Sequence, residues 1–220
     1  MFRVKICGVT TPADAELAVA CGADAVGINL FRGSRRFVGE GAAREIVRAV
    51  GDGAEVFAVF VNEAPETIRE LCARIGVARV QLHGDETAGV AGRIPFWRMK
   101  AVHAGGEVDL DALRGYPCEA FLVDAGKAGE YGGTGKELPW ATLRDRFGGL
   151  LAKPGETGPG KPWALAGGLT PGNVERAIAL ARPFAVDAAS GVESAPGKKD
   201  PDKVAAFIGK ARRGLLLAGA

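Results

Sequence analysis

Two side chains that can transfer protons lie at the ends of short apolar runs. Cys7 ends the run FRVKIC, residues 2–7, immediately before Gly8, and Asp124 lies at the end of AFLVDA, residues 120–125. A thiol with a lowered pKa can accept a proton, and a carboxyl group with a raised pKa can donate one. Each residue also has a structural interpretation, because a buried cysteine behaves as a small hydrophobe and an aspartate often caps a helix. Their chemistry depends on the elements that position them.

Eight short apolar runs recur along the chain, and most are nearly continuous rather than alternating. Such runs are typical of parallel strands that are buried on both faces. Glycine, at 33 of 220 residues, clusters just after them. We predict strands over residues 2–7, 25–30, 55–61, 78–82, 96–102, 120–125, 162–167 and 184–189.

Amphipathic stretches with helix signals separate most of these runs. The stretch 11–22 begins with Thr-Pro and ends in Gly22, and the stretch 170–181 begins with the same Thr-Pro pair. This pair is a typical N-cap followed by a first-turn proline. The other predicted helices cover residues 39–51, 64–76 and 200–218, with short ones over 85–93 and 109–115.

The alternation of strands and helices predicts an α/β fold, a single-domain (β/α)8 TIM barrel over residues 1–220. Barrels of this kind begin at about 200 residues. A doubly wound open sheet is the alternative, which the absence of G-x-G-x-x-G after the first strand disfavours. Residues 148–162 are rich in Gly and Pro and lack periodicity, so we expect a flexible surface loop there.

Charge and cysteine usage argue against several classes of function. The 28 basic and 26 acidic residues give a net charge of +2, which offers no electrostatic reason to bind nucleic acid or an anionic membrane. The four cysteines and two histidines have no zinc-site spacing, so we predict free thiols, no metal and a cytoplasmic location. No signal peptide or membrane-spanning run is recognisable.

Glycine-rich loops follow three predicted strands in succession. Gly167 and Gly168 follow the seventh strand, Ser190 and Gly191 follow the eighth, and YGGTGK follows the sixth. The active site of a barrel lies at the C-terminal ends of its strands, where loop N–H groups often bind phosphate. Tight turns are the alternative interpretation, but three such loops in a row favour a phosphate site. A phosphate there suggests that the two proton-transfer residues act on a sugar phosphate.

Two arginines and a histidine are further candidates at the strand ends. In SRRFV, Arg35 and Arg36 are adjacent, and a guanidinium can bind a carboxylate in bidentate fashion. We interpret Arg35 as a solvent-exposed loop charge. His83, which follows the fourth strand, is either a substrate contact or a polar residue at the barrel rim. We assign no function to His103 or to the three other cysteines.

Six motifs along residues 4–200 resemble, in order, those of the phosphoribosylanthranilate isomerase family: KICGVT, SRRFV, VQLHGDE, FLVDA with GGTGK, LAGGLTPGNV and DAASGVESAPGKKD. The resemblance implies an isomerase of tryptophan biosynthesis. Its reaction is the Amadori rearrangement of N-(5-phosphoribosyl)anthranilate to 1-(2-carboxyphenylamino)-1-deoxyribulose 5-phosphate. The resemblance also implies general acid/base catalysis without metal or cofactor, because the imine formed from the substrate is itself the electron sink.

The resemblance further implies a role for each candidate residue. Cys7 falls on the general base and Asp124 on the general acid. Arg36 falls on the arginine that binds the anthranilate carboxylate, although Arg35 replaces the proline that usually precedes it. The expected substrate contacts are His83 and Asp187, and the expected phosphate contacts are Gly167, Gly168, Ser190 and Gly191. We expect a monomer or a homodimer.

Three other activities are open to a barrel of this kind. A pentose-phosphate 3-epimerase typically has metal-binding histidines at several strand ends, whereas only His83 lies at one here. The related Amadori isomerase of histidine biosynthesis typically uses two aspartates, whereas the first strand here ends in Cys7. A phosphate-binding regulator would bind the substrate without consuming it, and the fluorescence of the anthranilate group distinguishes that case.

Overall fold

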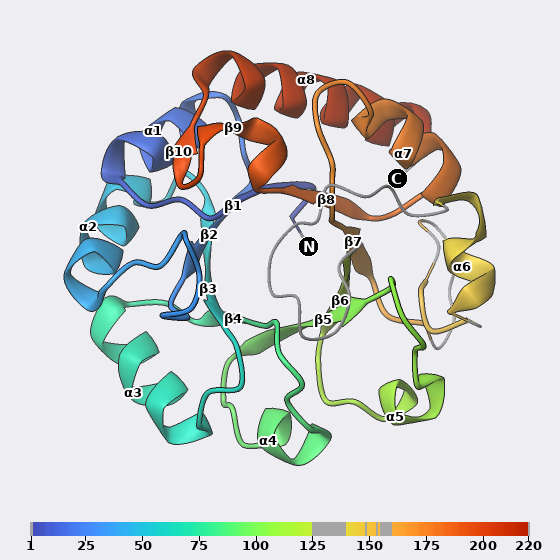
Figure 1. The fold of residues 1–220 in the computed structure, drawn as a ribbon, viewed down its shortest axis with the longest axis horizontal. Helices are drawn as coiled ribbons and strands as arrows, with labels where there is room; N and C mark the ends of the chain where they lie inside the picture. Colours follow the sequence, from blue (N-terminus) through green and yellow to red (C-terminus); the bar gives the residue numbers. More distant parts are fainter. Residues whose placement is uncertain (1, 125–139, 148, 153, 155–159, 220) are drawn as a thin grey trace.

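In the part of the chain that this computed structural model describes, residues 2–124, 140–147, 149–152, 154 and 160–219, eight parallel strands form a closed barrel (Figure 1). β1 pairs with both β2 and β8, which closes the sheet. The strands are β1 (Val4–Cys7), β2 (Ala25–Asn29), β3 (Glu55–Phe60), β4 (Arg79–Leu82), β5 (Trp97–His103), β6 (Ala120–Asp124), β7 (Trp163–Leu165) and β8 (Ala185–Ala188). The predicted (β/α)8 TIM barrel is confirmed.

Helices form a ring around the barrel (Figure 1). They are α1 (Pro12–Ala20), α2 (Glu40–Val50), α3 (Pro65–Ile75), α4 (Ala88–Gly92), α5 (Leu110–Arg114), α6 (Leu143–Arg146), α7 (Val174–Ala181) and α8 (Pro201–Leu217), with 3₁₀ turns η1 (Trp140–Thr142) and η2 (Ser190–Val192). After η2, β9 (Glu193–Ala195) and β10 (Lys198–Lys199) form a hairpin. The sequence patterns did not suggest α6 or this hairpin.

Of the two Thr-Pro pairs, only the first begins a helix as predicted. The Thr11 hydroxyl accepts a hydrogen bond from the Asp14 N–H at 3.2 Å and so caps α1. α7 begins at Val174, so the predicted helix over 170–181 begins too early. There the Asn173 side chain accepts a hydrogen bond from the Thr170 N–H at 2.8 Å, and residues 171–173 form a turn in which the Val174 N–H donates to the Thr170 carbonyl at 3.1 Å.

The expectation of a flexible surface loop over 148–162 is wrong for the described ends of that stretch. Leu150 and Leu151 are buried, and Leu151 pairs with Lys161 in a parallel bridge. The middle of the stretch, 155–159, lies outside the described residues. Two leucines in an otherwise Gly- and Pro-rich sequence are enough to attach it to the barrel, because their burial removes apolar surface from water.

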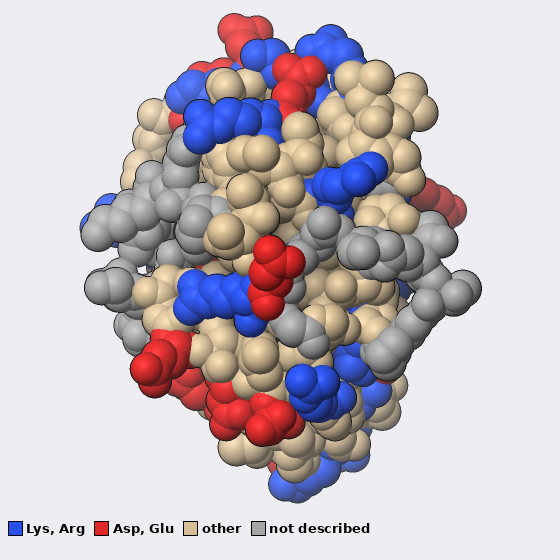
Figure 2. Space-filling model, turned by 90° about the vertical axis from the view of Figure 1, so that its right-hand side faces the viewer, with Lys and Arg blue, Asp and Glu red and all other residues tan. Residues whose placement is uncertain are grey.

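Basic and acidic side chains are mixed on the face of the molecule that Figure 2 shows, in keeping with the net charge of +2. Neither sign dominates among the described residues on that face. Within the described residues, every helix is too short or not apolar enough to cross a bilayer.

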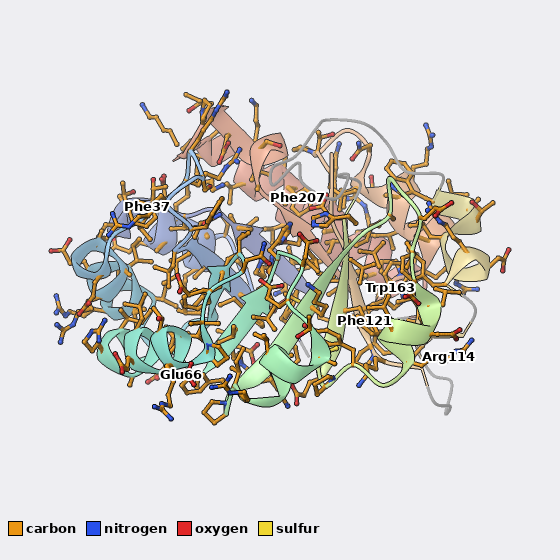
Figure 3. All side chains as sticks on the ribbon, turned by 60° about the horizontal axis from the view of Figure 1, so that its bottom comes forward. Phe37, Glu66, Arg114, Phe121, Trp163 and Phe207 are labelled. Carbon is orange, nitrogen blue, oxygen red and sulfur yellow. The ribbon has the colours of Figure 1, made fainter. Side chains whose placement is uncertain are left out.

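Two groups of buried apolar side chains form the core. The smaller group fills the barrel interior and consists largely of alanines, with Phe57 and Met99 among its larger members. The larger group packs between the strands and the helices, and it includes Phe121, Trp163 and Phe207, which Figure 3 labels. Because both faces of each strand are buried, the strands read as nearly continuous apolar runs in the sequence. Polar side chains inside the barrel therefore stand out.

A buried ion pair holds the loop that follows β4. Lys100 Nζ lies 2.8 Å from Glu86 Oε2 and donates a hydrogen bond to the Gly84 carbonyl at 2.6 Å. Glu86 Oε1 accepts hydrogen bonds from the Asn62 N–H at 2.8 Å and the Gly84 N–H at 3.1 Å. Both charged side chains are almost fully buried, so each depends on the other for stabilisation. The Lys100–Glu86 ion pair and its hydrogen bonds thus hold in place the loop that carries His83.

Glu86→Ala is expected to lower the free energy of unfolding by about 3–5 kcal/mol, because it leaves the Lys100 ammonium buried without its carboxylate. The matched control is Glu70→Ala, which removes the exposed Glu70–Arg74 pair, whose charged atoms are 3.8 Å apart. That change is expected to cost less than about 1 kcal/mol. Urea-induced unfolding measures both variants, and similar losses would contradict a stabilising role for the buried pair.

Candidate active site

A pocket opens at the C-terminal end of the barrel, where β1, β4, β6 and β8 end. Five residues predicted from the sequence line it together, namely Cys7, Arg36, His83, Asp124 and Asp187. The remaining lining residues are Gly8, Asn29, Phe31, Ser34, Val59, Val61, Gln81 and Ala189. A thiol, two carboxyl groups, an imidazole and a guanidinium from distant parts of the chain therefore meet in one place.

Lys5 lies on the same face of β1 as Cys7, because side chains two residues apart on a strand point the same way. Its side chain is fully buried. Lys5 Nζ donates hydrogen bonds to Asp187 Oδ1 at 2.9 Å and to Gln81 Oε1 at 3.0 Å. Burial disfavours the ammonium, but Asp187 and Cys7 together outweigh burial and raise the pKa of Lys5 above its usual value. A positive charge is therefore fixed beside the thiol.

Burial raises the pKa of the Cys7 thiol above its usual value, and the nearby Lys5 ammonium opposes this shift without reversing it. The Asp187 carboxylate adds to the upward shift. A catalytic thiol needs a positive neighbour, and one is present as Lys5. A base at this position must work against burial, with Lys5 as its main support.

Gly27 leaves the space that the thiol occupies. It pairs with Cys7 in the register of β1 and β2. A Cβ atom at this position would lie 2.6 Å from Cys7 Sγ and 3.1 Å from Lys5 Nζ. Any larger residue would displace the thiol or the ammonium. A glycine inside an apolar strand often marks such a close approach, so the sequence carried this signal in AVGINL.

His83 and Asp124 approach each other, with 3.8 Å between Nε2 and Oδ2. Because Lys5 holds the oxygen of the Gln81 amide, the amide nitrogen faces His83 and donates to Nδ1 at 2.7 Å. The proton of the neutral imidazole is thereby assigned to Nε2, toward Asp124. Desolvation lowers the pKa of His83 to about 4, although Asp124 opposes the shift. His83 is thus a neutral hydrogen-bond donor at neutral pH.

Arg36 reaches the pocket from the loop after β2 and is held by Glu193. Its Nε donates to Oε1 and its Nη2 to Oε2, both at 2.7 Å. This bidentate contact raises the pKa of Arg36 above its usual value. Gly8 has a φ of +70°, and a Cβ there would overlap Arg36 Cδ, so glycine is required on both counts. Arg35 is exposed, as predicted.

The glycines predicted to bind phosphate form turns beside the pocket but do not line it. Gly167 and Gly168 have φ values of +83° and +67°, which favour glycine. Gly191 lies in η2, after Ser190, against the Leu169 carbonyl, which a Cβ would overlap. The loops after β7 and β8 are therefore in contact at the strand ends. The third predicted loop, YGGTGK, lies outside the described residues.

The other cysteines differ from Cys7 in their surroundings. Cys72 and Cys118 are part of the apolar core, and burial raises the pKa of their thiols to about 12 and about 11. All four cysteines are free. Among the residues that the structure describes, no three His, Cys, Asp or Glu side chains are grouped in a way that could hold a metal ion.

Comparison with known proteins identifies the family of this barrel. Residues 4–210 match the family model described as N-(5'phosphoribosyl)anthranilate (PRA) isomerase. The N-(5'-phosphoribosyl)anthranilate isomerase of Neisseria meningitidis serogroup C is 42% identical over 214 residues, which cover 96% of this chain and 97% of the relative. This chain belongs to the N-(5'-phosphoribosyl)anthranilate isomerase family.

Solved phosphoribosylanthranilate isomerases have the same fold. The crystal structure of the Thermotoga maritima enzyme matches with a TM-score of 0.83 and 38% identity, over 97% of this chain and 100% of that chain. A structure in complex with reduced 1-(o-carboxyphenylamino)-1-deoxyribulose 5-phosphate matches with a TM-score of 0.80 and 36% identity, over the same shares. The expected activity is confirmed: this chain is an isomerase of tryptophan biosynthesis that acts on phosphoribosylanthranilate, a phosphorylated small molecule.

Sequence reasoning missed four polar residues around the pocket of this isomerase. Lys5 and Gln81 are polar residues flanked by apolar neighbours in their strands, and a polar residue at such a position must find a buried partner. These polar residues can therefore be recognised in the sequence, but the sequence does not show which buried residue each one pairs with. Glu193 and Lys199 belong to the SGVE and GKKD segments, which contributed to the resemblance without being given roles.

Gly27→Ala is expected to reduce turnover by about 100-fold, because the new Cβ forces the Cys7 thiol to rotate and a displacement near 1 Å costs about that much. The control is Gly41→Ala in α2, where an added Cβ meets nothing within 4 Å. That control is expected to keep full activity and to gain about 0.5–1 kcal/mol of stability. Steady-state kinetics and thermal unfolding measure both, and normal turnover by Gly27→Ala would show that thiol placement is unimportant.

Proposed function

We propose that Asp124 and Cys7 carry out the proton transfers of this isomerisation, as general acid and general base. The Asp124 carboxyl group gives its proton to the ring oxygen while the bond from that oxygen to C1 breaks and the nitrogen forms a double bond to C1. The Cys7 thiolate then takes the proton from C2, and the electron pair of that C–H bond moves toward the iminium nitrogen to give an enolamine. The enolamine becomes the ketone as its C2 hydroxyl loses a proton and C1 gains one, and net return of the Cys7 proton to Asp124 through water restores both groups. This assignment is supported by the position of both residues in one pocket at the strand ends.

Neighbouring side chains suit these two roles. The Lys5 ammonium lowers the free energy of the thiolate relative to the buried thiol. The neutral His83 imidazole directs a donor toward Asp124, which stabilises the carboxylate left after proton transfer. We assign His83 and Asp187 to substrate contacts as well, because both line the pocket.

The carboxylate and the phosphate of the substrate bind at different parts of the pocket rim. Arg36 binds the anthranilate carboxylate, and in support its guanidinium lines the pocket with donors beyond the two that Glu193 accepts. Backbone N–H groups of the loops after β7 and β8 bind the phosphate. The residues assigned to it are Gly167, Gly168, Ser190 and Gly191, in keeping with their turns beside the pocket.

The proposal extends to the setting of the enzyme. We assign residues 1–220 to one domain that works in the cytoplasm without metal or cofactor and without a nucleic-acid or membrane partner; the net charge of +2 supports the last point. We propose a monomer or a homodimer. A relative from Thermotoga maritima was solved as monomers of a dimeric isomerase, matching with a TM-score of 0.79 at 36% identity.

Cys7→Ser and Asp124→Asn are each expected to lower turnover by about 10²–10⁴-fold, the usual contribution of a general acid or base. A hydroxyl is a much poorer base than a thiolate, and an amide cannot deliver the proton. Both variants are expected to bind the reduced product analogue normally. Cys21→Ser, outside the pocket, is the control and is expected to keep wild-type turnover. The roles are wrong if Cys7→Ser or Asp124→Asn turns over near the wild-type rate.

Arg36→Met is expected to reduce kcat/KM by an amount equivalent to about 2–5 kcal/mol, because it removes one partner of a desolvated charge pair with the substrate. Arg35→Met is the matched control and is expected to stay near wild type, since Arg35 is exposed. The substrate fluorescence assay measures both. A larger loss for Arg35→Met, or equal losses in the two variants, would show that the anthranilate carboxylate does not bind Arg36.

A further inference from the structure

The charge of Arg36 is already matched within the protein. Glu193 accepts two hydrogen bonds from the Arg36 guanidinium, each at 2.7 Å, and the Glu193 side chain is only 5% exposed. Burial pushes the pKa of Glu193 upward, but Arg36 and Lys199 outweigh burial and hold it below its usual range. The carboxylate is therefore ionised. A substrate carboxylate that approaches Arg36 therefore meets an ion pair of zero net charge. The negative member of this pair, the Glu193 carboxylate, lies behind the guanidinium and repels the substrate carboxylate.

Lys199 changes this charge balance. Its side chain is fully buried, and Nζ lies 3.0 Å from Glu193 Oε1, the same oxygen that Arg36 Nε contacts. Nζ also donates to the Cys7 carbonyl at 2.7 Å and to the Ala189 carbonyl at 3.3 Å. Three acceptors match the three N–H groups of an ammonium. Lys199 thus has no donor left for a ligand, and what it contributes to the pocket is charge.

The hairpin of β9 and β10 places these charges together. Lys199 pairs with Glu193 in its register, and Arg36 reaches the same carboxylate from the loop after β2. The three residues, here called the rim triad, carry two positive charges and one negative charge. The neighbouring Lys5 and Asp187 form a pair of zero net charge. Of these two groups of described residues, the rim triad therefore supplies a surplus positive charge beside the pocket.

We propose that the rim triad determines specificity for a substrate with one carboxylate, and that Lys199 is its charge-setting residue. Arg36 supplies the hydrogen-bond donors and Lys199, which acts through Glu193, supplies the surplus charge that the ligand carboxylate neutralises. Glu193 orients Arg36 and joins the two cations. This inference rests on the proposed contact between Arg36 and the anthranilate carboxylate.

The test compares two stable ligands: reduced 1-(o-carboxyphenylamino)-1-deoxyribulose 5-phosphate and its counterpart without the ring carboxylate. The readout is the ratio of their dissociation constants, measured by calorimetry, which cancels any general damage to the pocket. Lys199→Met is expected to weaken binding of the carboxylate ligand by about tenfold or more, equivalent to about 1.4 kcal/mol, and to leave the other ligand unchanged. Lys198→Met, at the exposed neighbouring position, is the matched control and keeps the wild-type ratio.

Charge rescue separates a charge-setting role from a structural one. In the double variant Glu193→Gln with Lys199→Met, Arg36 alone restores the surplus charge, so the ratio is expected to recover most of the loss. A structural role predicts the opposite, because the double variant has lost two buried contacts. The inference is wrong if Lys199→Met weakens both ligands equally or if the double variant shows no recovery.

Two further variants cover the remaining outcomes. If Lys199→Met does not fold, the single variant Glu193→Gln tests the inference. It raises the surplus positive charge, so it is expected to increase the preference for the carboxylate ligand. An unchanged or reduced preference overturns the inference. Arg36→Met tests the underlying contact separately. An unchanged ratio there refutes the carboxylate role of Arg36 itself, whereas a loss in Arg36→Met without one in Lys199→Met refutes only the role of Lys199.

Discussion

The interaction on which the pocket depends is the burial of the Lys5 ammonium inside the barrel. A charged group removed from water must be paired and hydrogen-bonded, and Lys5 meets this demand with Asp187 from β8 and Gln81 from β4. Each partner is then constrained in turn. The Gln81 amide can present only its nitrogen to His83, which places the imidazole proton on the side of Asp124. The buried lysine thus orders Asp187 and Gln81 directly, and through Gln81 it orients His83 toward Asp124.

The same lysine sets the conditions for the thiol. Burial strengthens electrostatic interactions and also disfavours isolated charges, so the site that makes Lys5 effective also makes the Cys7 thiolate costly. The protein balances the two by keeping one cation beside the sulfur and by leaving no side chain at Gly27 that would separate them. On the other side of the pocket, the neutral imidazole of His83 faces Asp124. The pocket therefore presents a cation to the thiol and a neutral donor to the carboxyl group.

The sequence predicts the residues that sit at strand ends better than the contacts between them. The apolar runs locate the strands, and Cys7 and Asp124 stand out because their types can do chemistry. The pairing of Lys5 with Asp187 spans 182 positions along the chain, and no local pattern encodes a contact of that range. The predicted start of the helix at residue 170 is wrong for a local reason, because residues 171–173 form a turn that the Asn173 side chain holds through hydrogen bonds with Thr170 and Gly168.

Closure of the barrel between β1 and β8 links catalysis to the order of the strands along the chain. Lys5 and Cys7 lie on the first of the eight barrel strands along this sequence, whereas the carboxylate of Asp187 and the ammonium of Lys199, which donates to the Cys7 carbonyl, follow only after the intervening strands. Pairing across so long a loop is slow, because its closure entropy must be met before the contact forms. The buried ion pair of Lys5 and the hydrogen bond to the Cys7 carbonyl therefore form only when the two ends of the barrel meet. The surroundings of the thiol are complete only at that closing step.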